Sequence, residues 1–255
     1  MSTDVVTTVV TGSTLVITID RPAARNAVNG DVATGIAAAV DRLASDDDLR
    51  VGVLTGAGGY FSAGMDLKAA ATGDHALVGS KGFGGLTEAR VDKPLVAAVE
   101  GFALGGGFEL ALSCDLVVAG RSASFGLPEV TRGLIPGGGG VVRLTERLPH
   151  HVALEMLLTG KPQPAPSLAA YGLVNEVVDD GEALTAALAL AATVGANAPL
   201  ALGAVKRLVR WAPDVTEAQA MDLMRAESSR LSASDDFAEG VRAFTEKRAP
   251  EWSGR

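Results

Sequence analysis

A unit of buried strand, glycine-rich loop and helix recurs along this chain, and it constrains the fold more than any other feature. The run VGVLTG (51–56) precedes GAGGYFSAGMDLK, and LVAAVEG (95–101) precedes FALGGG and the helical run FELAL. A looser copy starts at DLVVAG (115–120) and continues through SASFGLPEVTRG. Strands that alternate with helices indicate an α/β architecture, and the recurrence is compatible with a spiral of similar turns.

The two ends of the chain have different patterns. VVTTVV (5–10) and LVITID are β-branched runs on either side of a Thr-Gly-Ser turn, which predicts a hairpin, and an alanine-rich helix is expected from Asp31 to Ser45. From about Gly181 the pattern is helical, with helices expected near 182–197, 199–211, 215–231 and 235–248. We therefore predict an α/β core over residues 1–197 and a helical region over residues 198–255.

Residues 69–90 do not fit the recurring unit. They hold five glycines and show little periodicity. We predict a mobile loop that leads into a short helix, and loops of this length are often functional.

Composition excludes one class of partner. The chain is 47% hydrophobic and 20% charged, which is enough apolar material for one large core. Its formal net charge is −8, and the sequence has no run of Lys or Arg. A polyanion would be repelled, so we expect no nucleic-acid partner.

The sequence favours a cytoplasmic protein without a membrane partner. The first Lys or Arg is Arg21, so no charged segment precedes an apolar block as in a signal peptide. The uncharged stretch 183–205 is long enough for a bilayer, but it is alanine-rich and is interrupted by Gly195, Asn197 and Pro199. We expect two helices that meet near Pro199.

Several common catalytic and binding motifs are absent from the sequence. It has no GxxxxGK[ST] phosphate loop, no GxGxxG after a strand and no GxSxG nucleophile elbow. The only histidines are His75, His150 and His151, so we expect neither a metal site nor a Ser/His/Asp triad. Cys114 lies in an apolar helical run and is expected to be a small buried hydrophobe.

The glycines at 105–107 stand directly before FELAL, although each glycine costs a helix about 1 kcal/mol relative to alanine. The first amides of a helix have no internal acceptor and lie at the positive end of the helix dipole. They can stabilise an oxygen that becomes negative during a reaction, and bare glycine lets a substrate reach them. Close packing of the helix is the alternative explanation if this motif stands alone.

Two glutamates are tied to glycine-rich turns. Glu109 lies inside FELAL, and Glu129 follows Pro128. An unpaired buried carboxylate is costly, so each glutamate is either exposed or buried for a reason, and for one alone the exposed position is favoured. Two of them could converge on one water, with one accepting a proton and the other donating one.

Taken together, these stretches resemble the enoyl-CoA hydratase/isomerase (crotonase) superfamily. The resemblance covers nearly the whole chain, with each segment in the expected order. The segments are RPAARNAV, FSAGMDL, KPLVAAVEGFALGGGFELALSCDLVVAG, SFGLPEVTRGLIPGGGG, LLTG, YGLVNEVV and EGVRAFTEKRAPEWSGR. The resemblance implies a crotonase-type spiral of ββα turns, followed by a helical C-terminal trimerisation region that builds homotrimers, often paired into homohexamers.

The resemblance also implies catalytic roles. The backbone amides of Met65 and Gly106 would form an oxyanion hole for a thioester carbonyl. Glu129 would exchange the proton at C2 of the acyl group, and Glu109 would position and activate the water that attacks C3. Members that isomerise or cleave often lack one of these glutamates. Both are present here, which favours a hydratase that converts a 2-enoyl-CoA to a 3-hydroxyacyl-CoA.

Binding of the CoA portion is implied for two sets of residues. Arg25, Ala63 and Lys68 match positions beside the CoA phosphates and adenine. Phe244 and Lys247 match a C-terminal helix that approaches the CoA site, sometimes from a neighbouring subunit. A solvated surface role is the alternative for each basic residue. No metal or separate cofactor is implied, because coenzyme A is part of the substrate.

Two features leave the branch of the family open. Met65 stands where hydratases often have alanine, so its side chain would narrow or reshape the acyl entrance. GGGFELAL and EKRAPEWSGR look close to the carnitinyl-CoA dehydratases, which share both glutamates. Enoyl-CoA isomerisation and a non-catalytic acyl-CoA-binding subunit are the remaining alternatives.

Overall fold

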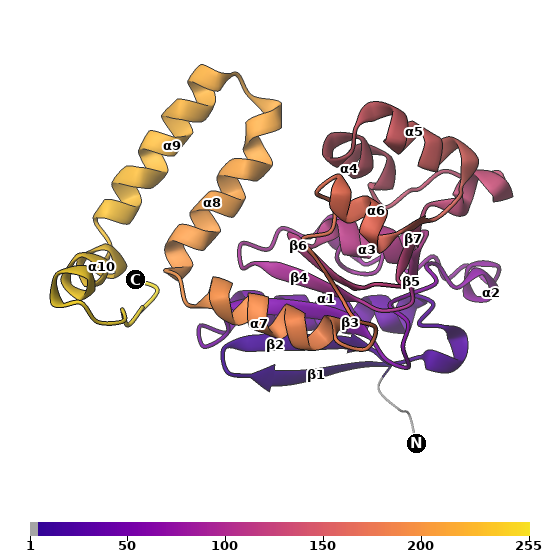
Figure 1. Cartoon of the computed structure of the whole chain (residues 1–255), viewed down its shortest axis with the longest axis horizontal. Coiled ribbons are helices and arrows are strands. Elements are labelled where there is room, and N and C mark those ends of the chain that lie inside the picture. Colours follow the sequence, from indigo (N-terminus) through magenta and orange to yellow (C-terminus); the bar gives the residue numbers. More distant parts are fainter. Residues whose placement is uncertain (1–4) are drawn as a thin grey trace.

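Two β-sheets form the centre of the molecule in the computed structural model, which describes residues 5–255 (Figure 1). The larger sheet has the strand order β1-β2-β3-β4-β6-β9. These strands are β1 (Val6–Thr11), β2 (Thr14–Ile19), β3 (Val51–Gly56), β4 (Leu95–Val99), β6 (Leu116–Gly120) and β9 (Glu176–Val178). The first two form an antiparallel hairpin, and the other neighbours are parallel. The predicted hairpin and the α/β class are confirmed.

The smaller sheet lies where the recurring glycine loops follow the strands. It contains β5 (Phe102–Leu104), β7 (Ser124–Gly126) and β8 (Gln163–Pro164). A parallel bridge between Ser62 and Ala103 joins the loop after β3 to β5. The loops after β3 and β4 therefore run side by side, although about 40 residues separate them in the sequence.

Helices cover both faces of the larger sheet. Successive side chains of a strand point to opposite faces, and buried strands here carry apolar side chains on both. Val53, Val96 and Val118 pack with α7 (Ala183–Gly195), which lies along one face (Figure 1). Leu54 and the helix α1 (Gly30–Ser45) belong to the main core on the other face. The expected helix at 31–45 is therefore confirmed.

A second layer of short helices surrounds the smaller sheet (Figure 1). These helices are α3 (Gly106–Ser113), α4 (Gly140–Arg147), α5 (His150–Thr159) and α6 (Ala165–Ala170). Helix α2 (Leu67–Ala70) lies at the edge of the molecule, where the Asp66 side chain caps its first amides. Cys114 follows α3 and is buried, as expected, and burial raises the pKa of its thiol to about 12.

The last three helices form an arm that projects from the sheets (Figure 1). The C-terminal arm comprises α8 (Pro199–Trp211), α9 (Glu217–Ser232), α10 (Asp235–Glu246) and the tail 247–255. The predicted helix boundaries agree with α7–α10 to within two residues. Thr216 forms a capping box at the start of α9, and Ser234 caps α10, which explains why the boundaries are readable from the sequence.

The chain bends sharply between α7 and α8. Across residues 5–255 no single helix is long and apolar enough to cross a membrane, and the pair Ala183–Gly195 and Pro199–Asp214 is bent by 104° at its break. Helix α7 packs on the sheet, whereas α8 joins the arm. The break lies beside residues 197 and 198, and the division of the chain into a core and a helical region at this point stays a prediction.

Candidate active site

The three glycines at 105–107 are required by the backbone conformation of Gly105 and by the space around Gly106 and Gly107. Gly105 has φ +53° and ψ −129°, and its amide donates to the carbonyl of Gly126 at 2.8 Å. A Cβ on Gly106 would lie 2.5 Å from Cζ of Phe83, and one on Gly107 would lie 2.5 Å from the carbonyl oxygen of Ser62. Both positions are too tight for a side chain, so glycine lets α3 begin directly against its neighbours.

The same close approach brings two backbone amides together. The Cβ position of Gly64 lies 2.9 Å from the nitrogen of Gly106, which places the FSAGMD loop against the start of α3. Val28 bonds the residues on either side of Met65, accepting from Asp66 at 2.9 Å and donating to Gly64 at 2.8 Å. The amide of Met65 itself therefore faces away from Val28.

Both amides are available to a ligand. Within residues 5–255, neither the Met65 amide nor the Gly106 amide donates a hydrogen bond to another protein atom. Gly106 is the first residue of α3, so its amide is one of the helix-start donors without an internal acceptor. Two such donors in adjoining loops are the arrangement that stabilises an oxygen carrying negative charge.

Glu109 is buried, with 3% of its surface exposed. Its Oε1 accepts hydrogen bonds from the amides of Gly138 at 2.7 Å and Gly140 at 2.9 Å, so the carboxyl caps the start of α4. Burial raises the pKa of Glu109 above its ordinary value, although the two amides and the positive charge of Arg143 act in the opposite direction.

Glu129 lies at the start of a short 3-10 helix, η3 (Pro128–Arg132), and its carboxyl reaches back to the glycine turn. Its Oε1 is 3.1 Å from the Cβ position of Gly105. Its Oε2 is buried and has no hydrogen-bond partner in the part of the chain that the structure describes. Burial raises the pKa of Glu129, and the negative charge of Glu109 raises it further. A buried oxygen without a partner is where a water or a substrate is expected.

The structure therefore brings four predicted groups to one place. The amides of Met65 and Gly106 can hold a carbonyl oxygen, while Glu109 and Glu129 can exchange protons with a molecule bound beside it. The negative charge of Glu109 opposes ionisation of Glu129 and so raises its pKa. Such a site can add or remove a proton and a water at neighbouring atoms.

Three of the predicted CoA-binding residues lie next to this site. Arg25 is exposed with φ +53°, and its carbonyl accepts from the amide of Ala63 at 3.0 Å. Lys68 is exposed on α2, three residues after Met65. Ala63 lies on the loop that supplies the Met65 amide, Arg25 contacts this loop through its carbonyl, and Lys68 follows the loop on α2.

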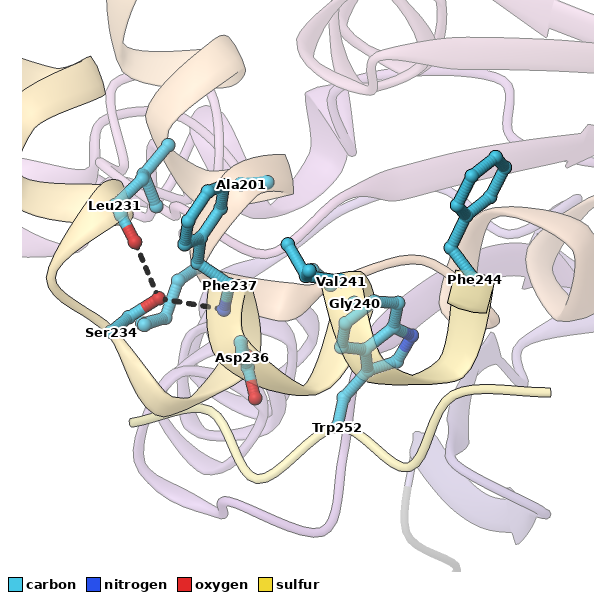
Figure 2. A pocket seen from close by; sticks show the side chains of 11 residues that line it. Ala201, Leu231, Ser234, Asp236, Phe237, Gly240, Val241, Phe244 and Trp252 are labelled. Atoms are coloured by element: carbon cyan, nitrogen blue, oxygen red, sulfur yellow. Dashed lines mark hydrogen bonds between the residues drawn. The ribbon is translucent and has the colours of Figure 1, made fainter. Parts of the chain in front are cut away.

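Phe244 and Lys247 are not brought to this site within one chain. Both lie on or just after α10, at the opposite end of the molecule from α2 (Figure 1). Phe244 is 87% exposed and borders an apolar groove of about 440 Å³ in the arm. Figure 2 shows Phe237, Val241 and Phe244 on the same side of α10, with Trp252 of the tail next to Gly240.

The structure changes the interpretation of residues 69–90. The segment 82–87 is buried, and turns occupy 84–88 where a short helix was expected. Gly85 lies too close to the backbone of Ala33 for any side chain, and Phe83 lies against Gly106. The second half of this segment is therefore part of the packing around the site, and the expectation of a mobile loop is wrong for it.

Sequence reasoning also missed the roles of a glycine turn and of one arginine. The glycines at 137–140 supply the amides that hold Glu109, and Arg143 contacts this turn. The signal was present, because glycines stand directly before a helix here as they do at 105–107.

Within residues 5–255 no group of three or more His, Cys, Asp or Glu side chains could hold a metal ion. Whether the protein needs a cofactor stays a prediction.

Comparison with known proteins identifies relatives over nearly the full length. The profile of the family described as enoyl-CoA hydratase/isomerase matches residues 10–255. The enoyl-CoA hydratase EchA19 of Mycobacterium tuberculosis is 45% identical over 251 residues, which cover 96% of this chain and 94% of that protein. The carnitinyl-CoA dehydratase of Proteus mirabilis is 42% identical, with 96% of each chain covered.

Solved structures agree with these matches. An enoyl-CoA hydratase from M. tuberculosis superimposes with a TM-score of 0.97 at 46% identity, covering 99% of this chain and 100% of that one. A carnitinyl-CoA hydratase from Mycobacterium avium superimposes with a TM-score of 0.79 at 46% identity, with both chains fully covered. The same architecture therefore occurs in relatives whose names differ in acyl group.

Proposed function

Because the chain belongs to the enoyl-CoA hydratase/isomerase family, we propose that it is a hydro-lyase that adds water to a 2-enoyl-CoA thioester and forms a 3-hydroxyacyl-CoA. The observation that carries this proposal is the pair of the buried Glu109 and the half-buried Glu129 beside two amides without protein partners. Hydration moves a proton to one carbon and a hydroxyl group to its neighbour. It therefore needs a base and an acid in one site.

The two amides have a direct use in this reaction. The thioester carbonyl oxygen accepts hydrogen bonds from Met65 and Gly106, which makes C3 electrophilic. When the water oxygen bonds to C3, negative charge moves onto the carbonyl oxygen, and the amides stabilise that enolate. The start of α3 adds the positive end of its helix dipole.

The environments of the two carboxyls support different roles. Glu109 accepts two backbone hydrogen bonds and faces Arg143, so it is the better site for the negative charge. It takes a proton from the attacking water. Glu129, with a partner-free buried oxygen, is the better site for the proton that is given to C2. A proton that returns from Glu109 to Glu129 restores the pair.

Coenzyme A would enter as part of the substrate. Arg25, Ala63 and Lys68 lie on or beside the loop of the Met65 amide and would contact its adenine and phosphates. Phe244 and Lys247 would come from a neighbouring subunit, because they lie far from this site in their own chain (Figure 1).

We propose a homotrimer or homohexamer built through the arm, whose apolar groove is typical of an interaction surface (Figure 2). No other cofactor is needed, and a cytoplasmic location stays a prediction.

A second candidate is dehydration or hydration of carnitinyl-CoA. Relatives named for that substrate match the whole chain, and both glutamates suit either acyl group. Met65 is half-buried and packs on the core, and its amide would hold the thioester carbonyl, so its side chain would contribute to the choice of acyl group. Isomerisation of an enoyl-CoA and a non-catalytic acyl-CoA-binding role are weaker alternatives, since neither uses both carboxyls.

The test is hydration of crotonyl-CoA, followed by loss of the enoyl-thioester absorbance and a mass gain of one water. We expect wild type to turn over, and Glu109→Gln and Glu129→Gln each to lose about 10²–10⁴-fold in kcat. Glu155→Gln on the exposed surface of α5 is the matched control and should retain full activity. Products of unchanged mass would identify an isomerase, and turnover of carnitinyl-CoA alone would identify the second candidate.

A further inference from the structure

Arg143 is a partly buried arginine of α4 that points back to the turn before its own helix. Its Nη1 donates to the carbonyl of Gly138 at 2.8 Å, and its Nη2 donates to the carbonyl of Thr87. A Cβ on Gly139 would collide with Nη1, so the guanidinium lies directly against the turn. Its charge lowers the pKa of Glu109, but the proposed chemistry gives no part to its two hydrogen bonds.

Gly138 links Arg143 to the site. Its carbonyl accepts from Arg143, and its amide donates to Oε1 of Glu109 at 2.7 Å. The amide of Gly138 is therefore fixed by Glu109, and its carbonyl is fixed by Arg143. The amide of Gly140 completes the contact with Glu109 at 2.9 Å. Since glycine has little intrinsic preference for one conformation, the four-glycine turn needs an external contact to keep these amides aligned.

We propose that Arg143 is a positioning residue that holds the 137–140 turn, and through it the Glu109 carboxyl, in the geometry that water addition requires. The inference rests on the proposed function. Its second anchor is the carbonyl of Thr87, at the end of the buried segment 82–87, whose Phe83 lies against Gly106. Arg143 thereby joins the glutamate turn to the segment that packs on the oxyanion amide.

The charge of Arg143 supplies a second readout. It faces Glu109 and lowers the pKa of that carboxyl, while Glu129 is the other charged group of the site. The charged groups around Arg143 itself are Arg147, Glu146 and Glu88. Removal of the guanidinium should therefore raise the pKa of Glu109, so that the ionised base appears only at higher pH.

The test compares Arg143→Met, Arg143→Lys and Arg147→Met in the full-length protein. Arg147 is the matched control because it lies one turn later on α4 and donates to the carbonyl of Leu112 at 2.7 Å, outside the Glu109 turn. We expect Arg143→Met to lower kcat for crotonyl-CoA about 10²-fold with little change in KM, since misplacement of a reacting group by about 1 Å has this effect. The acidic limb of its kcat/KM profile should move to higher pH.

Arg143→Lys keeps the charge but cannot make both hydrogen bonds as a planar fork. It should keep the acidic limb near wild type and recover part of the lost kcat, whereas Arg147→Met should keep both. Equal losses in Arg143→Met and Arg147→Met, or an unmoved acidic limb in Arg143→Met, would overturn the inference.

The titration of the Glu109 carboxyl, followed by NMR with ¹³C-labelled glutamate and assigned through Glu109→Gln, does not depend on turnover. If wild type hydrates no enoyl-CoA, the proposed function fails. The titration then still tests whether Arg143 acts on the Glu109 carboxyl. A Glu109 pKa that is higher in Arg143→Met than in wild type supports the contact, and an equal pKa contradicts it.

Discussion

The active-site half of the molecule and the C-terminal arm use the same residue types in opposite ways. In the site, Gly106 and Gly107 leave no room for a methyl group, because neighbouring atoms lie 2.5 Å from their Cβ positions. In the arm, the nearest atom to the Cβ position of Gly203 is 3.4 Å away, which is an ordinary contact. Glycine is therefore required at Gly106 and Gly107 by tertiary packing, whereas Gly203 merely interrupts a helix.

Carboxyls differ between the two regions in the same way. Glu109 and Glu129 form no salt bridge within residues 5–255, and burial raises the pKa of each. In the arm, Glu239 pairs with Arg242 and Arg248, and these contacts lower its pKa. The arm satisfies its charges within the chain, whereas the site keeps polar groups that only a ligand can satisfy.

The largest expected effect comes from Gly106→Ala. The new methyl group must displace Phe83 or the start of α3, so the amide that faces the ligand moves. We expect a loss of about 10²–10³ in kcat, the usual result of losing one oxyanion donor, and about 1–3 kcal/mol of stability from overpacking. Steady-state hydration kinetics and urea unfolding measure the two effects.

Phe83→Leu provides the internal control for this prediction. It removes the ring atoms that lie 2.5 Å from the new methyl group, so the double variant should recover part of both losses. Failure of the double variant to recover would mean that the backbone of α3, and not Phe83, requires glycine at this position.

The next largest effect is expected in the arm, from Asp236→Ala. Its buried Oδ1 accepts from the amide of Ser253 at 2.7 Å and from the amide of Gly254 at 3.0 Å, which fixes the tail against α10. We expect a loss of about 1–3 kcal/mol, because the amides lose a charged acceptor. Amide hydrogen exchange should rise in residues 250–255 and leave the site protected.

Asp235→Ala is the matched control, since Asp235 has the same charge and lies in the same helical turn but is exposed. It should cost well under 1 kcal/mol, the usual range for a surface change. Equal losses in the two variants would assign the effect to the helix dipole and not to the tail.

The comparison also explains how much could be predicted from the sequence. The arm was predicted to within two residues, because Thr216 and Ser234 are local caps and helical periodicity is a local signal. The crotonase-type fold followed from the resemblance and is confirmed by the structures of relatives. The roles predicted for Glu109 and Glu129 stay predictions, although the two carboxyls do lie in one site.

The parts that could not be predicted depend on long-range contacts. Phe83 has no periodic pattern around it and was assigned to a mobile loop, yet it packs against Gly106 from 23 positions away in the sequence. Arg143 was not singled out, because its two acceptors are backbone carbonyls, one of them 56 residues away. A carbonyl is present at every residue, so no residue type marks such a contact in the sequence.

The pH dependence of stability should have opposite signs in the two regions. Because the folded pKa of Glu109 is raised, its contribution to stability falls as pH rises from its unfolded value, about 4.5, through its folded value. Glu109→Gln should therefore be more stable than wild type at neutral pH, since glutamine can still accept from both amides, and the difference should vanish below about pH 4.5.

Glu239 gives the opposite expectation. Its folded pKa is lowered, so its contribution is present above its unfolded value and is lost as pH falls below that value. Glu239→Gln should be less stable than wild type at neutral pH, with a difference that shrinks in acid. Urea unfolding of both variants from pH 8 down to about pH 2 tests the pair, and two curves of the same sign would contradict the comparison.

The smallest expected effect has the opposite sign to the first. Gly203 lies inside α8, and its Cβ position has Arg207 and Asp92 at ordinary contact distance, so alanine there should fit and stiffen the helix. We expect Gly203→Ala to stabilise the protein by about 0.5–1 kcal/mol, the difference between glycine and alanine in a helix interior, with unchanged kcat. The shift in the urea midpoint at constant slope measures it. A loss of stability would contradict this prediction, because it would mean that the contacts with Arg207 or Asp92 are too tight for a methyl group.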